Sequence, residues 1–305
     1  MDNYFVSSCK RVKDWICRQF GQKEKKTVHH KKFADGGEVI VWETGRAGEE
    51  AASYENLFLR KEIAGFRTNI RREQSCSIKS LTRDYLYKQL LSSGEYTFDH
   101  MLVIKDPYGE APLTALALFI LEEPACVRVT TKGNLKETDF VTELPKKKEH
   151  RVPILGMYAE KANDIVIEIL DDEGNCVKSH TFTIRTKRLP KSLRNVITVK
   201  KWTDKPAYSN IMINGGVKIH TCVFDIEGKI RYYLSRKPRG YGIFPLSDGH
   251  FFYMEKYISV PSYSNPQTVE SYDMDYFGRV FRTYLTEKGS PHGGRKGWRQ
   301  HSHRK

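Results

Sequence analysis

The sequence lacks any pair of closely spaced cysteines. Six cysteines are scattered along the 305 residues, and no two of them form a CxxC motif. Zinc sites and redox motifs that use cysteine need such spacing, so the pattern argues against a zinc centre and gives no support to a disulfide framework. The six are Cys9, Cys17, Cys76, Cys126, Cys176 and Cys222.

Long apolar runs are missing as well. Residues 1–20, MDNYFVSSCKRVKDWICRQF, are interrupted by charged side chains and do not supply the apolar segment of a signal peptide. No other stretch approaches the roughly 20 apolar residues of a membrane-spanning helix. We therefore expect a cytoplasmic protein with no membrane partner.

Positive charge is abundant but unevenly distributed. The chain has 51 Lys and Arg against 37 Asp and Glu, a formal net charge of +14. Much of the excess lies in residues 10–32 and 289–305, while the middle of the chain is mixed in sign. The last segment has Trp298 as its one aromatic residue and lacks the interleaved basic and aromatic pattern of a nucleic-acid surface. We expect solvated charge at two ends and no specific nucleic-acid partner.

Residues 1–92 read as an N-terminal extension that is partly helical. Apolar residues recur at helical spacing over residues 7–20 and 80–93, and Ser80 or Thr82 would cap the second helix. A short strand, EVIVW at residues 38–42, lies between them. His29 and His30 are adjacent in a lysine-rich loop, so we interpret them as solvated residues and not as metal ligands.

From Thr97 the apolar pattern changes to that of strands. Seven short strands separated by Pro, Gly, Asn and Asp turns predict an antiparallel β-sandwich over residues 93–190, closed by the linker RLPKS at 188–192. The predicted strands are 98–106, 113–121, 125–133, 139–144, 150–158, 163–170 and 178–186. The strand 113–121, LTALALFIL, would form an exposed edge open to strand addition.

Three repeated hairpins follow after Arg194. Residues 223–234, 242–255 and 270–285 each read as two strands around an Asp or Gly turn. Such repeats are typical of β-propeller blades, and residues 191–288 suffice for about two of them. The predicted fold is therefore mainly β: a sandwich, then an incomplete propeller, after a short helical segment. Residues 289–305 are expected to be a disordered basic tail.

Several of these segments are more specific than their apolar pattern. Residues 95–133, EYTFDHMLVIKDPYGEAPLTALALFILEEPACVRVTTKG, followed by EHRVPILGMY and FTIRTKRLP, resemble the N-terminal sandwich of bacterial arylsulfotransferases. The three hairpins are similar to the start of that family's propeller, so the resemblance covers residues 95–288. Residues 1–92 lie outside it.

The resemblance implies transfer of a sulfuryl group from a phenolic sulfate to an acceptor phenol. In this family a histidine carries the group between donor and acceptor, and no diffusible cofactor takes part. A neutral imidazole suits that role because it is a good nucleophile near pH 7 and then a good leaving group. The family's nucleophilic histidine falls in later blades, beyond residue 305.

None of the histidines in this chain matches that nucleophile. The histidines in or beside predicted strands, which we interpret as surface or edge-strand positions, are His100, His150, His180, His220 and His250. His292 falls near the family's substrate-pocket motif, although no acid follows it as the family pattern requires. We therefore expect a truncated and inactive N-terminal fragment.

The basic segment at residues 289–305 leaves two interpretations open. Read one nucleotide forward, codons 290–305 allow a histidine, acids, a turn and an apolar strand, as a propeller hairpin requires. The segment is then an out-of-frame product; otherwise it is a genuine basic tail. The alternative to an enzyme fragment is a non-enzymatic sandwich that forms homodimers by strand addition at 113–121.

Overall fold

The computed structural model describes most of the chain, in several stretches. The described residues are 28–33, 37–54, 72–200, 210–213, 220–236, 240–258, 267–285 and 299–301. The predicted helix at 7–20, His292 and most of the segment 289–305 lie outside them. No helix among the described residues is long and apolar enough to cross a membrane.

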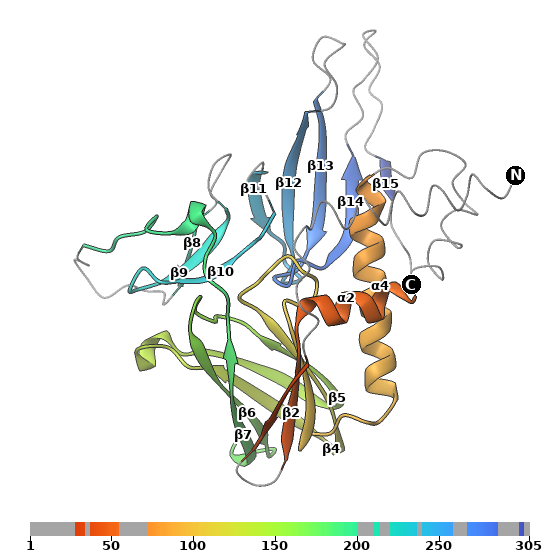
Figure 1. Ribbon diagram of the computed structural model, residues 1–305, viewed down its shortest axis with the longest axis vertical. Coiled ribbons are helices and arrows are strands. Elements are labelled where there is room, and N and C mark those ends of the chain that lie inside the picture. Colours follow the sequence, from red (N-terminus) through yellow and green to blue (C-terminus); the bar gives the residue numbers. More distant parts are fainter. Residues whose placement is uncertain are drawn as a thin grey trace, which may run out of the picture.

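The largest sheet has seven strands and forms the lower half of the molecule in Figure 1. They are β1 Val28–Lys32, β2 Glu38–Trp42, β3 His100–Lys105, β4 Ala115–Thr131, β5 Phe140–Ile154, β6 Ala162–Leu170 and β7 Cys176–Arg185. The order is β1-β2-β3-β4-β6-β7, with β5 paired to β4. Lys31 Nζ on β1 donates to the Thr183 carbonyl on β7, so the first and last strands come together and the sheet is nearly closed.

Two of the expected strand pairs turn out to be single long strands. Residues 113–121 and 125–133 belong to β4, and residues 139–144 and 150–158 belong largely to β5. Pro124 does not end β4, because the β4–β5 register shifts between Ile120 and Ala125 and the irregularity accommodates a residue without a backbone donor.

The prediction that residues 113–121 form an exposed edge is wrong. This part of β4 pairs with β3 on one side and with β5 on the other. Leu116, Leu118 and Phe119 are buried there. A central strand leaves no free backbone groups for a second molecule, so this segment is not available for dimerisation.

The interior of the large sheet is a continuous apolar core. Its members alternate along β3 to β7, as in Val103, Phe119, Val129 and Ile167, all at most 2% exposed. Burial of such side chains contributes roughly 1.5–3 kcal/mol each. The mainly β fold class is confirmed, and the nearly closed sheet is consistent with the predicted sandwich.

Two helices cover the outer face of β2, β3 and β4. They are α2 Thr44–Ala52 and α4 Arg72–Ser92, and the second confirms the helix expected at 80–93. Leu86, Tyr87 and Leu91 of α4 pack in one buried cluster with Leu102 and Leu118 of the sheet. Figure 1 shows α4 running along the side of the molecule, past the large sheet and toward β14.

The capping roles expected for Ser80 and Thr82 are wrong, because α4 begins at Arg72. Ser80 Oγ instead accepts a hydrogen bond from the Val280 amide at 2.9 Å. Thr82 Oγ1 donates to the Ile78 carbonyl within the helix. The strand expected at 38–42 is confirmed as β2, which pairs in parallel with β3. Backbone pairing therefore joins residues on both sides of the expected boundary at residue 92.

All three expected hairpins are present after the large sheet. β8 Asn210–Ile213, β9 Cys222–Asp225 and β10 Ile230–Tyr233 form one antiparallel sheet. β11 Gly240–Pro245, β12 Phe251–Ile258, β13 Gln267–Met274, β14 Val280–Leu285 and β15 Arg299–His301 form a second. The pairs β9–β10, β11–β12 and β13–β14 are the three hairpins.

The turns of the β6–β7, β9–β10 and β13–β14 hairpins have the same construction. In each, an Asp carboxylate accepts from the backbone amides two and four residues further on, and a Gly three residues on has a positive φ. The pairs are Asp171 with Gly174, Asp225 with Gly228, and Asp275 with Gly278. The carboxylate satisfies donors of the turn, and glycine adopts the left-handed conformation at little cost.

Candidate functional site

Two of the strand histidines are buried, which corrects their interpretation as surface residues. His180 is 3% exposed and lies between the rings of Phe33 and Phe98, with centroids 4.0 and 4.6 Å away. Its Nε2 lies 2.8 Å from Asp99 Oδ1. His150 is 2% exposed and stacks on Phe119. Both rings are therefore held as parts of the core.

The remaining strand histidines also have fixed partners. His100 Nδ1 lies 3.0 Å from Glu38 Oε1, and His220 Nδ1 lies 2.8 Å from the Leu234 carbonyl. His250 Nδ1 lies 3.0 Å from Asp273 Oδ1, with the ring stacked on Phe281. These contacts through Nδ1 orient each ring within or beside a strand.

His29 and His30 lie on the exposed strand β1. His30 Nδ1 is 3.4 Å from Glu38 Oε2. Within the described residues no three His, Cys, Asp or Glu side chains come together in a way that could hold a metal ion. His292 lies outside the described residues, so the structure does not test its expected place in a substrate pocket.

The densest buried polar arrangement surrounds Arg231 on β10. Arg231 is 1% exposed, and its guanidinium lies 3.9 Å from the centre of the Tyr158 ring. Nε donates to the Gly156 carbonyl at 2.6 Å, and Nη1 donates to the Thr138 carbonyl at 2.8 Å. Nη1 also approaches Asp225 Oδ2 at 3.3 Å. One side chain of the β9–β10 hairpin thus holds two loops of the large sheet.

Asp225 and Tyr158 complete this arrangement. Asp225 is fully buried, and its Oδ2 accepts a hydrogen bond from the Tyr158 hydroxyl at 2.9 Å. Its Oδ1 accepts from the turn amides of Glu227 and Lys229. Burying a carboxylate is expensive unless a cation and several donors surround it, and both are present here. The buried Arg231–Asp225 ion pair therefore depends on the β9–β10 hairpin staying packed against the loops of the large sheet.

A second polar cluster joins helix α4 to the β13–β14 hairpin. Arg279 donates through Nε to Asp84 Oδ2 at 2.8 Å. The other carboxylate oxygen of Asp84 accepts from the Tyr108 hydroxyl at 2.5 Å. Glu110, in the same loop as Tyr108, lies 3.7 Å from Lys79 and 3.5 Å from Arg236. Side chains from four separate segments meet in this cluster.

Two carboxyls in this region are strongly affected by burial. Desolvation raises the pKa of Asp106 to about 6, although the Ala111 amide donates to this side chain. Desolvation likewise raises the pKa of Asp275 to about 6, against the effect of the turn amides of Phe277 and Arg279. Both carboxyls accept hydrogen bonds from backbone amides of their own loops, which is a structural role.

Neither polar cluster was predicted from the sequence. Arg231, Asp225 and Arg279 stand next to predicted turns, where a charged residue is usually solvated. Their partners lie far along the chain: Gly156 is 75 residues from Arg231, and Asp84 is 195 residues from Arg279. In IRYY, Arg231 stands between apolar residues and all four side chains are buried, whereas simple strand alternation would place Arg231 on the face opposite Ile230 and Tyr232.

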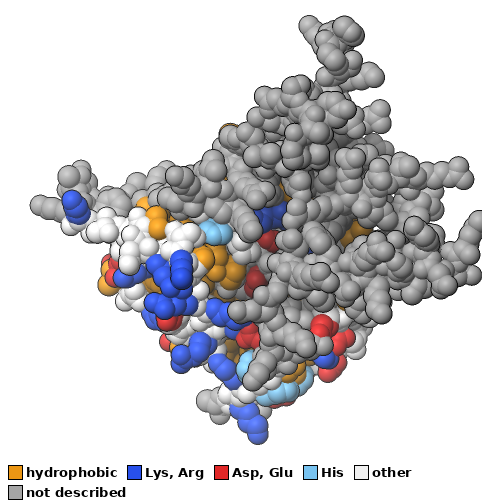
Figure 2. All heavy atoms as spheres, turned by 45° about the horizontal axis from the view of Figure 1, so that its top comes forward, with side chains coloured by type: hydrophobic (Ala, Val, Ile, Leu, Met, Phe, Trp, Pro, Cys, Tyr) orange, Lys and Arg blue, Asp and Glu red, His pale blue; other side chains and the backbone are white. Residues whose placement is uncertain are grey.

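On the face shown in Figure 2, the described Lys and Arg side chains do not form a single basic patch. In the view of Figure 2 they lie among Asp, Glu, His and apolar side chains. Many are paired, such as Arg128 with Glu143 and Lys132 with Asp139. This mixture agrees with the mixed sign of charge in the middle of the sequence.

Comparison with known protein families identifies one region. Residues 102–187 match the family model described as the arylsulfotransferase Ig-like domain. The matched stretch runs from β3 through β7 and contains the core of the large sheet. No curated protein matches the chain. The match supports the expected arylsulfotransferase N-terminal domain; it ends before the first of the three later hairpins.

Proposed function

We propose that this chain is the N-terminal portion of an aryl-sulfate sulfotransferase. The match of residues 102–187 to the arylsulfotransferase Ig-like domain carries this proposal. In it, the Ig-like domain is the base on which a catalytic propeller is assembled. Enzymes of this kind transfer a sulfuryl group from a phenolic sulfate to a phenol.

The two hairpin sheets are then the first propeller blades. They support this interpretation because both are small antiparallel sheets that pack on a common apolar cluster. The cluster includes Tyr232 of β10 and the adjacent Leu234 with Tyr253 and Tyr272 of the second sheet. Propeller blades bury their faces against neighbouring blades in the same way. The Arg231 and Asp84–Arg279 contacts would fix these blades on the Ig-like domain.

The proposed chemistry has two displacements at sulfur. A histidine nitrogen attacks the sulfur of the donor ester, an N–S bond forms, and the S–O bond to the donor phenol breaks as the phenolate leaves. The acceptor phenol then loses its proton and attacks the same sulfur, which releases the imidazole. The donor ester supplies an already activated group, so one hard transfer is divided into two easier ones without a diffusible cofactor.

In this proposal the nucleophile is not one of the histidines of the large sheet or of the hairpins. His150, His180 and His250 are each held by a stacked ring and a polar partner, and polar contacts also hold His29, His30, His100 and His220. We therefore propose that the chain is inactive by itself and that the nucleophile lies in a later blade. The histidine at position 292 would lie near the substrate pocket.

The test is turnover of 4-nitrophenyl sulfate with phenol as acceptor. We expect the purified chain to release no 4-nitrophenolate above the buffer rate. Co-expression with the polypeptide encoded downstream of codon 305, in whichever frame encodes further blade-like hairpins, should restore release. Turnover by the chain alone that His292→Ala abolishes would contradict a nucleophile in a later blade. Absence of any downstream sequence with blade-like hairpins would contradict the assignment to a split sulfotransferase.

A further inference from the structure

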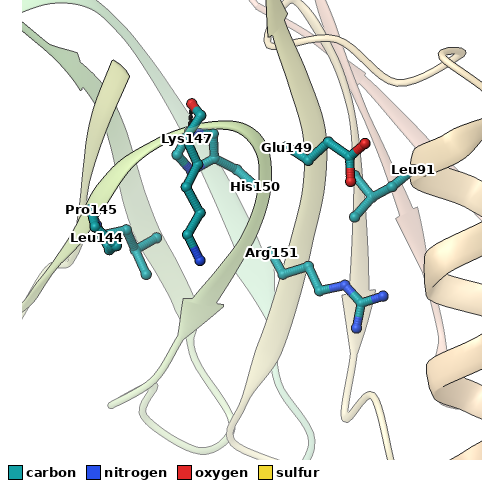
Figure 3. Close-up of a pocket in the computed structure, with 7 residues that line it drawn as sticks. All are labelled: Leu91, Leu144, Pro145, Lys147, Glu149, His150 and Arg151. Atoms are coloured by element: carbon teal, nitrogen blue, oxygen red, sulfur yellow. Dashed lines mark hydrogen bonds between the residues drawn. The ribbon is translucent and has the colours of Figure 1, made fainter. Parts of the chain in front are cut away.

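A cavity of about 380 Å³ lies within the large sheet, beside the end of α4 (Figure 3). It is lined by Leu91, Leu144, Pro145, Lys147, Glu149, His150 and Arg151. Apart from Leu91, all of these belong to β5. The cavity therefore lies between β5 and the end of α4, and none of its lining residues belongs to the two polar clusters.

The β4–β5 ladder is interrupted beside this cavity. Ile120 pairs with Glu149 and Ala125 with Lys147, so four residues of β4 lie opposite one residue of β5. A bulge of this kind bends a strand and redirects its side chains, and bulges are enriched beside binding sites. Pro124 lies in the bulged part of β4 and cannot restore the missing hydrogen bond.

The wall of the cavity is held rigidly by His150. The His150 Nε2 lies 2.8 Å from the Lys147 carbonyl, and the ring stacks on Phe119 at 5.4 Å between centroids. Burial is the main cause that lowers the pKa of His150, so the ring is neutral near pH 7 and adds no charge of its own. The backbone that carries Lys147 is therefore fixed by a side chain of the core.

Two cations border the cavity without carboxylate partners. Among the described residues, neither Lys147 nor Arg151 has an acidic group within ion-pair distance, whereas the nearby Lys146 is paired with Asp172 at 2.5 Å. The one carboxylate on the lining is Glu149, which points toward Leu91 and lies higher in the view of Figure 3 than the charged ends of Lys147 and Arg151. The lining thus carries two cations and one carboxylate.

Charge and apolar surface together define the ligand class. A guanidinium fork and an ammonium group suit the oxygens of a carboxylate or of a phosphate-type monoester. Leu91, Leu144 and Pro145 suit a compact hydrocarbon or ring. The volume of about 380 Å³ lies near the lower end of the range for ligand sites, roughly 300–1,000 Å³. A single ring with one oxyanion group fits these limits, and a folded macromolecular segment does not.

We propose that the cavity between α4 and β5 binds a small organic oxyanion, with Lys147 and Arg151 holding its charged oxygens and Leu91, Leu144 and Pro145 its apolar body. This site does not depend on the sulfotransferase assignment, because its residues belong to α4 and β5 and none of them comes from the proposed propeller blades. It is a binding site and not a catalytic one: no described nucleophile faces it, and the one imidazole on its lining is held against Phe119.

The test is calorimetric titration of the full chain with four probes: phenyl phosphate, benzoate, phenol and inorganic phosphate. We expect saturable binding of phenyl phosphate or benzoate. Phenol, which lacks the oxyanion group, and inorganic phosphate, which lacks the ring, should bind at least about tenfold more weakly. Binding by phenyl phosphate alone identifies a phosphate-type monoester, and binding by benzoate alone identifies a carboxylate.

Matched charge variants distinguish this site from general attraction to a basic protein. Lys147→Gln and Arg151→Gln should each weaken binding about tenfold or more, while Lys148→Gln, the same change at a neighbouring residue off the lining, should leave it within about twofold. Thermal melts of the three variants check that each is folded. Equal losses in all three variants, or no saturable binding of any probe, would overturn the proposal.

Discussion

At the scale of single residues, Arg231 has the largest set of contacts between separate parts of the chain. It combines a buried ion pair with Asp225, hydrogen bonds to two carbonyls and a face-on contact with Tyr158. A buried pair of this kind adds little net stability compared with a well-packed apolar pair. Removing only one member of the pair is costly, because the other charge stays buried without a partner.

We therefore expect Arg231→Met to lower the free energy of unfolding by about 3–5 kcal/mol. The physical cause is the Asp225 carboxylate, which is fully buried and would lose its cation. The control is Arg188→Met, since Arg188 pairs with Glu160 where both side chains are more than 60% exposed, and such pairs contribute about 1 kcal/mol at most. Urea denaturation of both variants measures the difference; similar losses would show that the buried pair has no special role.

The buried carboxyl of Asp106 makes stability depend on pH in the direction opposite to that of most acids. Its pKa is raised from 3.8 to about 6 by desolvation, so the folded state binds a proton more tightly than the unfolded state. Its contribution is then most favourable below pH 4 and is lost as the pH rises through 6. A change of two pKa units corresponds to about 3 kcal/mol.

We expect Asp106→Asn to gain stability relative to the wild type as the pH rises from 4 to 7, by up to about 3 kcal/mol. Asparagine retains an acceptor for the Ala111 amide and tolerates the positive φ of 45° at this position. Asp171→Asn should behave in the opposite direction, because amides of Asn175 and Glu173 lower the pKa of Asp171. Urea midpoints at both pH values measure the effect, and a pH-independent difference would contradict it.

At the scale of elements, the repeated Asp-x-x-Gly turn allows strain and packing to be separated. Gly174 and Gly278 have similar positive φ values, 85° and 77°. An added Cβ at Gly174 would meet no atom within 4 Å, whereas at Gly278 it would overlap the Glu110 side chain. The same substitution therefore has the same backbone cost at both positions and a different steric cost.

Gly174→Ala should lower the free energy of unfolding by about 1–2 kcal/mol, the cost of a left-handed residue with a Cβ. Gly278→Ala should cost about 1–3 kcal/mol more, because the methyl group forces apart the β13–β14 turn and the Glu110 segment. Thermal and urea unfolding of the two variants test this. If the two alanine variants lose the same stability, the turn does not press on Glu110 in solution.

The elements that the sequence predicted best are those with a strong local signal. The three hairpins follow from Asp and Gly turns between apolar alternations, and the second half of α4 follows from its helical spacing. The continuous β4 was missed because Pro124, preceded by two acids, is typical of a turn. Tertiary pairing with β3, β5 and β6 overrides that local preference.

The polar sites were less predictable than the elements for a physical reason. A turn or a strand is specified by a few adjacent residues, but the partners of Arg231 are set by how two distant segments pack. The same holds for the cavity beside α4, which is lined by β5 next to the bulge in β4 and by the end of a helix more than 50 residues earlier. Only the resemblance to a known family anticipated the identity of the domain at residues 102–187.

At the scale of the whole molecule, the N-terminal region and the Ig-like domain form one structural unit. β2 pairs in parallel with β3, and α4 covers the outer face of the sheet. Without them, Leu102, Ile104 and Leu118, none of which has any exposed surface, would face solvent. An uncovered apolar face beside an unpaired strand edge favours association.

A chain that begins at residue 93 is therefore expected to bind a hydrophobic dye and to sediment as aggregates, whereas the full chain does neither under the same conditions. The reason is the loss of two contacts at once: the hydrogen-bond partners of β3 and the apolar side of α4. Dye fluorescence and sedimentation velocity at matched concentrations compare the two forms. If the shorter chain remains monomeric and binds no dye, the Ig-like domain folds independently, and the residues before 93 are a separable extension of it.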